Sequence, residues 1–254
     1  MLESGLTKTH HSDGVGAADV IKVMGLMKKK AGLTLEEFSR YWYEKHAPLG
    51  FQILPEDIRL TRYVQHYAVP MEGLGKPPFD GVAEFCFQDM DMFQKWFAWF
   101  MSDGGKPLRD DEGNFMDSSS VTVTIVEERV IIPDDDTRRD GIKLIAGVKR
   151  KSGLTLNEFK NYWYEKHAPL ALRVLPKPPF IKKYVHNYAI PVEGFGEQPF
   201  DGIGELCFDD MEAFQKSTEW FIGEGGQVLR DDEENFVDPS TRVAVVVRQR
   251  AILP

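Results

Sequence analysis

The sequence YWYEKHAPL occupies residues 41–49 and returns unchanged at residues 162–170. The same offset of 121 positions brings FDG at 79–81 onto 200–202, and LRDDE at 108–112 onto 229–233. A repeat of this length that is present only twice is not typical of a solenoid, which needs more and shorter units. The pattern instead indicates a fused dimer, in which two copies of one module pair within a single chain.

The repeat also predicts the domain boundaries. We expect module one at residues 20–133 and module two at residues 141–254, joined by a charged linker at 134–140. Residues 1–19 are polar and Gly-rich, and we expect a flexible tail there.

The composition narrows the possible partners and compartment. The 254 residues are 42% hydrophobic and 12% aromatic, which is enough for packed cores. The net charge of −9, without a basic stripe, argues against nucleic acid and anionic membranes as partners. Apolar runs are no longer than strands, and the N-terminal residues have no signal-peptide pattern, so we expect a cytoplasmic protein. Cys86 and Cys207 take equivalent strand positions, which favours small buried side chains over a disulfide.

Each module reads as an α+β unit. A capping box at Thr34 and Glu37 begins the first helix, and Pro48 is expected to end it near Ala47. The predicted order is strand, helix, strand, strand, helix, strand, which is the ferredoxin-like βαββαβ plan. In module one the expected elements are a strand at 21–28, this first helix, strands at 61–69 and 79–88, a helix at 90–101 and a strand at 121–132. Two helices cover one face of such a sheet, so the second module is expected to cover the other face.

The helix motif, the Asp-Gly strand and a late acidic segment resemble the EthD family. The motif residues are Phe38, Tyr41, Trp42, His46, Ala47, Pro48 and Leu49, with Phe159, Tyr162, Trp163, His167, Ala168, Pro169 and Leu170 in module two; the late segments are 111–117 and 232–238. The resemblance implies a dimeric α/β-barrel, in which two ferredoxin-like sheets enclose a lumen. Most relatives are single modules that dimerise, so this chain is expected to be a pseudo-dimeric monomer, with pairing into a homodimer left open.

His46 is the first candidate for chemistry, and His167 is its counterpart. His46 follows Phe38 by eight positions and Trp42 by four, so it lies on the apolar face of the predicted helix, at its C-terminal end. An imidazole beside a lumen can act as a general acid or base. The alternative is a core histidine bonded to a backbone carbonyl. The repeated helix motif also predicts two equivalent walls of the substrate cavity, with Trp42 and Trp163 as candidates for substrate binding.

Carboxylates in the third strand of each module come next. Alternation places Asp80 and Glu84 on the face opposite the aromatic residues, toward the lumen, and Asp201 and Glu205 are their counterparts. Asp80 and Glu84 are roughly 13 Å apart at the usual rise, too far to share a proton. Glu84 and Glu205 are candidate catalytic acids, and Glu84 is expected to act alone or to pair with His46 or Arg62; the alternative is a solvated or salt-bridged role. Asp80 and Asp201 are candidates for substrate binding, although a turn with the glycine that follows is the favoured alternative.

The second strand breaks the symmetry of the repeat. Module one carries His66, but the histidine of module two, His186, lies one position earlier in register, which moves it to the other face of the sheet. One of the two can therefore point inward while the other points outward, and both are candidate catalytic residues for proton transfer. The tyrosines around them are candidates for substrate binding beside the lumen: Tyr63, Tyr67, Tyr184 and Tyr188. The alternative is that they are ordinary strand aromatics.

The motifs favour an enzyme without a cofactor. The sequence has no Gly-rich phosphate loop, C-x-x-C, H-E-x-x-H or G-x-S-x-G motif, and no metal site is expected. The acidic clusters at 110–112 and 231–233 could attract a cation, but loop solvation is favoured. We expect acid–base proton transfer on a small hydrophobic, aromatic or polyketide-like substrate, of lyase, isomerase or dehydratase type.

Three alternatives stay open. The superfamily that the resemblance implies includes cofactor-free monooxygenases, isomerases, cyclases, lyases and heme enzymes, so the fold alone narrows function poorly. One alternative is therefore a monooxygenase. A second is a heme protein with His46 or His167 as axial ligand. The third is a non-catalytic carrier or accessory protein of a degradative or biosynthetic pathway.

Overall fold

A computed structural model describes residues 20–71, 76–134, 141–177 and 179–253. The expected tail at 1–19 and most of the linker at 134–140 lie outside the described residues. Module one contains β1 (Ile21–Lys29), α1 (Leu35–Tyr41), η1 (Trp42–His46), α2 (Ala47–Ile53), β2 (Arg62–Ala68), β3 (Gly81–Phe87), α3 (Met90–Met101), α4 (Lys106–Glu112) and β4 (Met116–Ile132). Module two contains β5 (Ile142–Arg150), α5 (Leu156–Tyr162), η2 (Trp163–His167), α6 (Ala168–Val174), β6 (Ile181–Ala189), β7 (Gly202–Phe208), α7 (Met211–Ile222), η3 (Glu224–Gly226), α8 (Gln227–Glu233) and β8 (Val237–Leu253).

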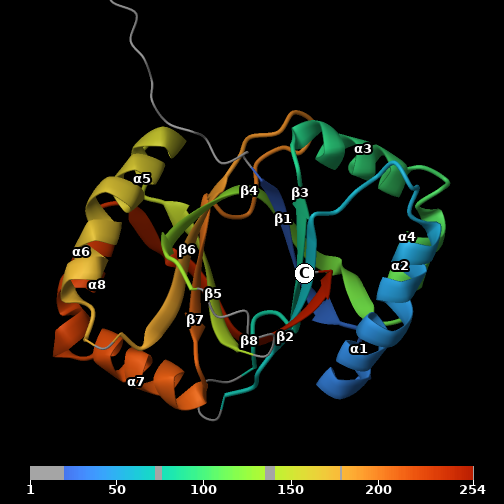
Figure 1. The fold of residues 1–254 in the computed structure, drawn as a ribbon. Coiled ribbons are helices and arrows are strands. Elements are labelled where there is room, and N and C mark those ends of the chain that lie inside the picture. The colour runs from blue at the N-terminus through green and yellow to red at the C-terminus, as the bar shows by residue number, and fades with distance from the viewer. Residues whose placement is uncertain (1–19, 72–75, 135–140, 178, 254) are drawn as a thin grey trace, which may run out of the picture.

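The eight strands close into one barrel. Its order is β1-β3-β2-β8-β5-β7-β6-β4, and the neighbouring strands pair antiparallel. Each module contributes a ferredoxin-like sheet, and the two sheets join where β2 pairs with β8 and where β4 pairs with β6. The helices of the two modules lie outside the barrel on opposite sides (Figure 1). The expected α+β class and the intramolecular dimeric α/β-barrel are confirmed.

The first helix does not end at Pro48. It continues without a break through a single π-helical turn, η1, into α2. Proline has no N–H to donate, and the wider turn lets the N–H of Ala47 reach the carbonyl of Trp42 instead. Pro48 then lies in the first turn of α2, directly after this wider turn. The prediction of a helix end near Ala47 was therefore wrong, and His46 lies in mid-helix rather than at a C-terminus.

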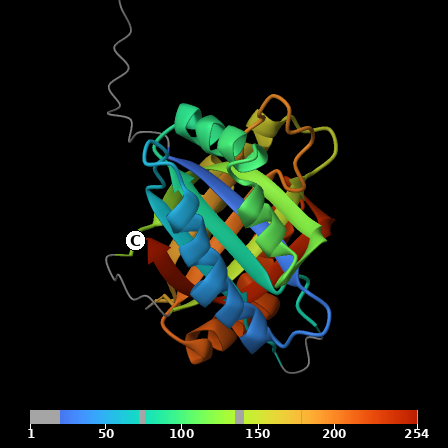
Figure 2. The same ribbon diagram turned by 90° about the vertical axis from the view of Figure 1, so that its right-hand side faces the viewer.

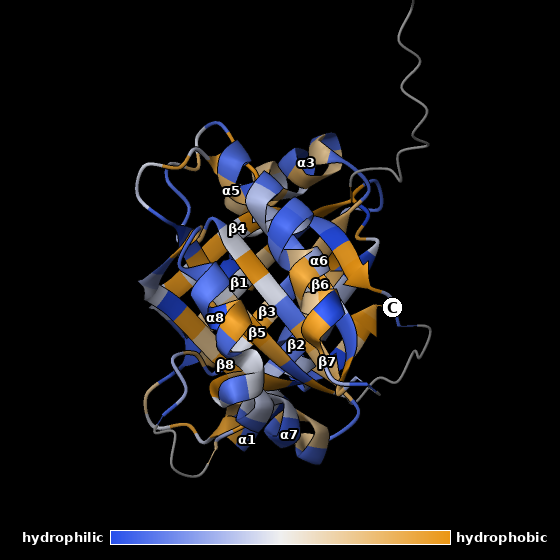
Figure 3. Cartoon of the chain, turned by 90° about the vertical axis from the view of Figure 1, so that its left-hand side faces the viewer, coloured by the Kyte–Doolittle hydropathy of each residue, from blue (hydrophilic) through white to orange (hydrophobic). Residues whose placement is uncertain are grey.

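Alternation along the strands separates the barrel interior from the surface under the helices. The interior holds an apolar cluster drawn from both sheets: Met24, Leu26, Ala68, Val82, Val126, Ile145, Phe200, Ile203, Val245 and Val247. Figure 3 shows the resulting bands of hydrophobic and hydrophilic residues along the strands. The opposite face of each sheet packs against helices, which cross it on the outside (Figure 2).

Contact between sheet and helix in module one depends on Gly81. A Cβ at this position would lie 2.8 Å from the ring of Trp42 and 2.9 Å from that of Phe38. Both rings are buried, and Phe115, the residue before β4, packs on them. The absence of a side chain at Gly81 therefore lets the motif helix approach the sheet closely and fixes the place of His46.

Candidate functional site

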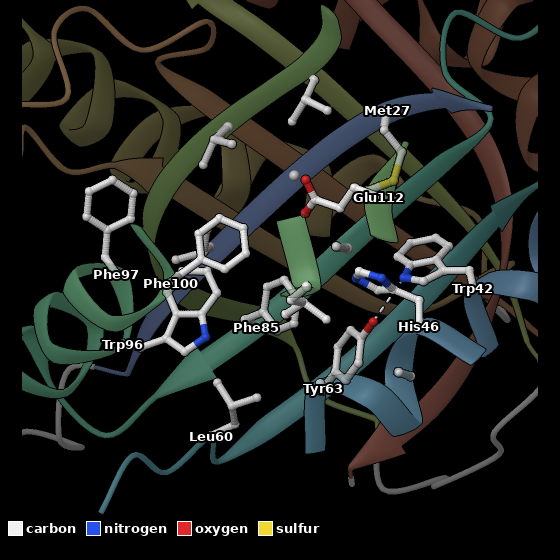
Figure 4. A pocket seen from close by; sticks show the side chains of 18 of the residues that line it. Met27, Trp42, His46, Leu60, Tyr63, Phe85, Trp96, Phe97, Phe100 and Glu112 are labelled. Atoms are coloured by element: carbon white, nitrogen blue, oxygen red, sulfur yellow. Dashed lines mark hydrogen bonds between the residues drawn. The ribbon is translucent and has the colours of Figure 1, made fainter. Parts of the chain in front are cut away.

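A cavity of about 380 Å³ lies between the sheet of module one and its helices. The cavity is therefore outside the barrel wall, not in the lumen where the substrate was expected. Most of its lining is apolar and aromatic, with Phe85 and Phe93 behind Trp96, which stacks on Phe100 with ring centroids 5.2 Å apart. A volume of this size is typical of small-molecule pockets. Figure 4 shows three polar side chains, His46, Tyr63 and Glu112, around the same space.

His46 is held by a carboxylate behind it. Its Nδ1 lies 2.9 Å from Oδ2 of Asp111, whose Oδ1 accepts bonds from Tyr41 and Asn114. Burial pushes the pKa of Asp111 upward, but these hydrogen bonds outweigh burial and lower it, so Asp111 is ionised and Nδ1 carries the proton. Burial also lowers the pKa of His46, more than Asp111 raises it. His46 is thus a neutral imidazole whose Nε2 lone pair is free to take a proton within the described part of the cavity.

Glu112 is the carboxyl group of the cavity. It ends α4, a helix that the sequence did not predict, and its side chain reaches the apolar lining. Burial, together with the charge of Asp111, raises the pKa of Glu112 to about 7, although Arg109 acts in the opposite direction. A carboxyl group with this pKa holds or releases a proton near neutral pH, which suits a general acid or base.

Tyr63 offers a hydroxyl group that is oriented by its neighbours. Its oxygen accepts one hydrogen bond from Nε1 of Trp42 at 3.0 Å and a second from Nε2 of Gln65 at 2.8 Å. The amide of Gln65 is itself fixed, because Tyr67 donates to its Oε1 and the carbonyl of Trp42 accepts from its Nε2. Burial raises the pKa of Tyr63, so the phenol is protonated. With both acceptor positions used, the O–H of Tyr63 is left to donate to a ligand.

Module two keeps the histidine dyad but changes its surroundings. His167 lies 2.8 Å from Asp232, as in module one. However, Glu233, the counterpart of Glu112, forms an ion pair with Arg242 at 2.6 Å, and module one has Val121 at the position of Arg242. The second carboxyl group is therefore paired with a cation, whereas Glu112 faces apolar side chains.

The strand histidines lie on opposite faces, as the register shift predicted. His186 is packed under the helix of module two, with its ring 4.2 Å from Trp163 and its Nδ1 2.7 Å from the hydroxyl of Tyr188. Burial lowers the pKa of His186 to about 2, so it stays neutral. Tyr184 accepts a bond from Trp163 beside it. The tyrosines of both modules thus face the helices, not the lumen, which corrects their expected place.

His66, by contrast, lies inside the barrel with the strand carboxylates. Its Nε2 is 3.0 Å from Glu84, which is also 2.5 Å from Arg62, as one sequence alternative predicted. Lys22 bridges to Glu205 at 2.8 Å, and Lys143 reaches the same carboxylate at 2.6 Å. Although burial opposes their charge, the lysines hold the pKa values of both glutamates well below the usual range.

This ionic cluster does not contact the cavity. Glu84 and Glu205 are ionised and fully paired, and none of the cavity lining comes from the cluster. The prediction that Glu84 and Glu205 face the lumen was right about their direction, but the structure separates them from His46 and from the aromatic pocket. The ion pair between Lys22 of β1 and Glu205 of β7 joins the two modules inside the barrel.

Asp80 and Asp201 anchor strand ends. Oδ2 of Asp80 accepts the N–H of Lys29 at 3.0 Å, and Asp201 accepts that of Arg150 at 2.8 Å. These contacts agree with the turn-forming alternative and place neither residue in the cavity lining. The acidic cluster at 110–112 is also split, since Asp110 pairs with Lys106 on the surface. Among the described residues no group of three or more His, Cys, Asp or Glu side chains could hold a metal ion.

Asp111 and Glu112 are the functional candidates that sequence reasoning missed. Both lie in the LRDDE repeat, which the sequence showed plainly but which was interpreted as solvated loop. In the structure this segment is the helix α4. Tyr41 donates a hydrogen bond to Asp111, seventy positions later, and this bond holds α4 against the YWYEKHAPL motif. Recurrence of both motifs with one fixed separation was the available signal.

Comparisons with solved structures agree with the barrel. An anthrone oxidase-like protein superposes with a TM-score of 0.62 at 10% identity, covering 92% of this chain and 94% of the other. A putative monooxygenase from Lactobacillus acidophilus NCFM gives 0.50 at 12% identity, with 92% and 97% coverage. A mutant chlorite dismutase from Candidatus Nitrospira defluvii gives 0.52 at 13% identity, with 92% and 93% coverage. At these identities the likeness shows the fold alone.

None of the helices in the described ranges has the length and apolar character needed to cross a bilayer.

Two further comparisons bear on identity. No curated protein sequence matches the chain. The family model of the EthD domain matches twice, at residues 30–119 and again at 151–240, so that each module gives a separate match. The chain therefore belongs to the EthD family, as a tandem duplication of its domain.

Proposed function

We propose that module one is a cofactor-independent enzyme site that transfers protons on a small, flat aromatic or polyketide-like molecule. The observation that carries this proposal is the convergence of a neutral histidine and a carboxyl group with a pKa of about 7 on one aromatic cavity. Stacked rings such as Trp96 and Phe100 favour a planar ligand.

Each polar group has a role in this proposal. Nε2 of His46 takes a proton from an acidic C–H or O–H of the substrate, while Asp111 stabilises the imidazolium that forms. The O–H of Tyr63 donates to the oxygen on which negative charge develops. Protonated Glu112 returns a proton at a second position, which yields isomerisation, elimination or dehydration according to the substrate. General acid–base groups of this kind contribute about 10²- to 10⁴-fold in rate.

The residues that line the cavity do not favour heme as a ligand. Nε2 of His46 could serve as an axial ligand. The two propionates of heme need cationic or polar partners, yet none of the described residues that line the cavity is Lys or Arg, and Glu112 adds another acid. The donor set of this cavity therefore does not fit heme.

Hydrogen exchange tests the proposal directly. Anthrone, a three-ring ketone with an acidic methylene, is incubated with the protein in D2O under nitrogen, and deuterium uptake is followed by mass spectrometry. We expect His46→Gln to lower the exchange rate by about 10²-fold or more. The matched variant His167→Gln should keep most of it, since Glu233 is paired in module two.

The same assay separates the alternatives. Product formation that requires oxygen, after exchange that does not, would assign a monooxygenase rather than a lyase or isomerase. Anthrone is tested in a panel that includes hydroxylated naphthols and anthraquinones. Saturable binding without exchange above the buffer rate would refute the catalytic proposal in favour of a carrier.

A further inference from the structure

One residue of the module-one cavity comes from module two. Phe195 follows β6 in the chain, yet its ring lies 4.6 Å from that of Phe97 and 5.6 Å from that of Phe93, both on α3. It is part of the cavity lining and of the apolar cluster beneath α3. The cavity of module one is therefore incomplete without the loop of module two.

The loop is anchored at its base and bent at its tip. At the base, Ile190 donates its N–H to the carbonyl of Ile125 at 2.9 Å, and the N–H of Ile125 donates to Oε1 of Gln198 at 2.6 Å. Gln198 also donates to the carbonyl of Ile190, so both ends of the loop are tied to β4 of module one. The base of the loop cannot shift without breaking contacts to the barrel.

Phe195 stands between two glycines in the left-handed region. Gly194 has φ of 86° and Gly196 has φ of 65°. A side chain at either position would be strained, so this backbone requires glycine. The paired left-handed residues turn the loop tip toward α3, and Phe195 is thereby directed onto its aromatic face.

We propose that Phe195 sets the length of the aromatic ligand that module one accepts. Because the loop base is fixed, the ring forms a firm end wall against Phe93 and Phe97 rather than a freely swinging side chain. A ligand that extends past this wall must displace the ring, whereas a shorter one contacts it. This inference rests on the proposed aromatic ligand class, but it does not require that the ligand react.

Two fluorescent or fluorescence-quenching probes of different length test the proposal. Binding of anthrone, with three rings, and tetracen-5(12H)-one, with four rings fused in line, is measured by quenching of tryptophan emission at fixed pH. In the unmodified chain we expect anthrone to bind more tightly than tetracen-5(12H)-one. Phe195→Ala should reverse the order, weakening anthrone and strengthening tetracen-5(12H)-one so that the ratio of their Kd values changes by roughly tenfold.

Two further variants keep the result interpretable. Glu193→Ala changes an exposed side chain on the same loop and should leave the ratio unchanged. Gly194→Ala retains the phenyl ring but disturbs its backbone, and should shift the ratio in the same direction as Phe195→Ala. Melting temperatures confirm that each variant is folded.

The decisive quantity is the ratio, not either affinity. A ratio that stays within twofold in Phe195→Ala would overturn the proposal, whether both affinities fall or neither does. Exchange of anthrone protons plays no part in this measurement. A shifted ratio without exchange would therefore uphold Phe195 as the end wall while refuting the proposed catalysis.

Discussion

Replacing Glu112 with Gln should stabilise the protein, and only at neutral and alkaline pH. Burial in an apolar cavity disfavours the ionised form of Glu112 and raises its pKa from 4.5 to about 7. The folded protein therefore holds this proton more tightly than the unfolded chain does. Below pH 4.5 the carboxyl group is neutral in both states and costs nothing; as the pH rises through 7 the folded state must ionise it at a cost.

The magnitude follows from the difference between the two pKa values. At 1.36 kcal/mol for each pKa unit, the full cost is about 3 kcal/mol, reached above pH 8. Glutamine has nearly the same shape and no charge, so Glu112→Gln removes this pH-dependent cost. The free energy of unfolding of the variant, relative to the unmodified chain, should thus grow by about 3 kcal/mol between pH 4 and pH 8.5.

Urea unfolding at a series of pH values, followed by tryptophan emission, measures this difference. Glu233→Gln is the matched control, since it removes the partner of Arg242 and should give no gain on raising the pH. A gain for Glu112→Gln that is equal at pH 4 and pH 8.5 would refute the raised pKa. So would a carboxyl titration of Glu112 by ¹³C NMR with a midpoint below pH 5.

The remaining predictions concern positioning and packing. Asp111→Asn should lower kcat more than it raises KM for any substrate that exchanges protons, because the Nδ1–H of His46 loses its charged acceptor; unchanged kcat would contradict the dyad. Gly81→Ala should destabilise by about 1–3 kcal/mol in urea unfolding, because its Cβ would press on Trp42, whereas Gly25→Ala, with its nearest neighbour at 3.9 Å, should change little. Lys22→Met should destabilise the protein by about 3 kcal/mol in the same measurement, because Glu205 and Glu128 lose one buried cation and keep only Lys143 and Arg62; an unchanged free energy of unfolding would refute a stabilising role for Lys22.

The succession of strands and helices followed from patterns that the chain carries twice, whereas the barrel was implied by the resemblance to the EthD family. Period-two alternation in FDGVAEF separated Glu84 from Phe85 correctly, since each face of that strand has one environment. The one-position shift of His186 likewise predicted opposite faces for the two strand histidines. These inferences concern local geometry, which residue type and spacing determine.

Which of the two faces carries the cavity could not be read from the same patterns. The lumen of a barrel and the space beneath its helices both bury side chains, so tyrosines on β2 were compatible with either. The choice depends on side-chain volumes across several elements, and here the lumen is filled by residues such as Met24 and Ile145. The π turn at Trp42 also escaped prediction, because proline usually ends a helix and nothing in the local sequence signals the wider turn that precedes Pro48 here.

Fusion of the two modules explains why identical motifs need not imply identical chemistry. In a homodimer any change that disables one cavity disables both, but in this chain each module can vary alone. The YWYEKHAPL motif is unchanged in module two. There, however, Arg242 pairs with Glu233, and Ser217 stands where module one has Trp96. The motif itself is needed to pack helix on sheet in both halves, so its identity reports folding. Under the proposed function, the differences around the motif, including the ring of Phe195 against α3, favour module one as the working cavity, which module two helps to complete.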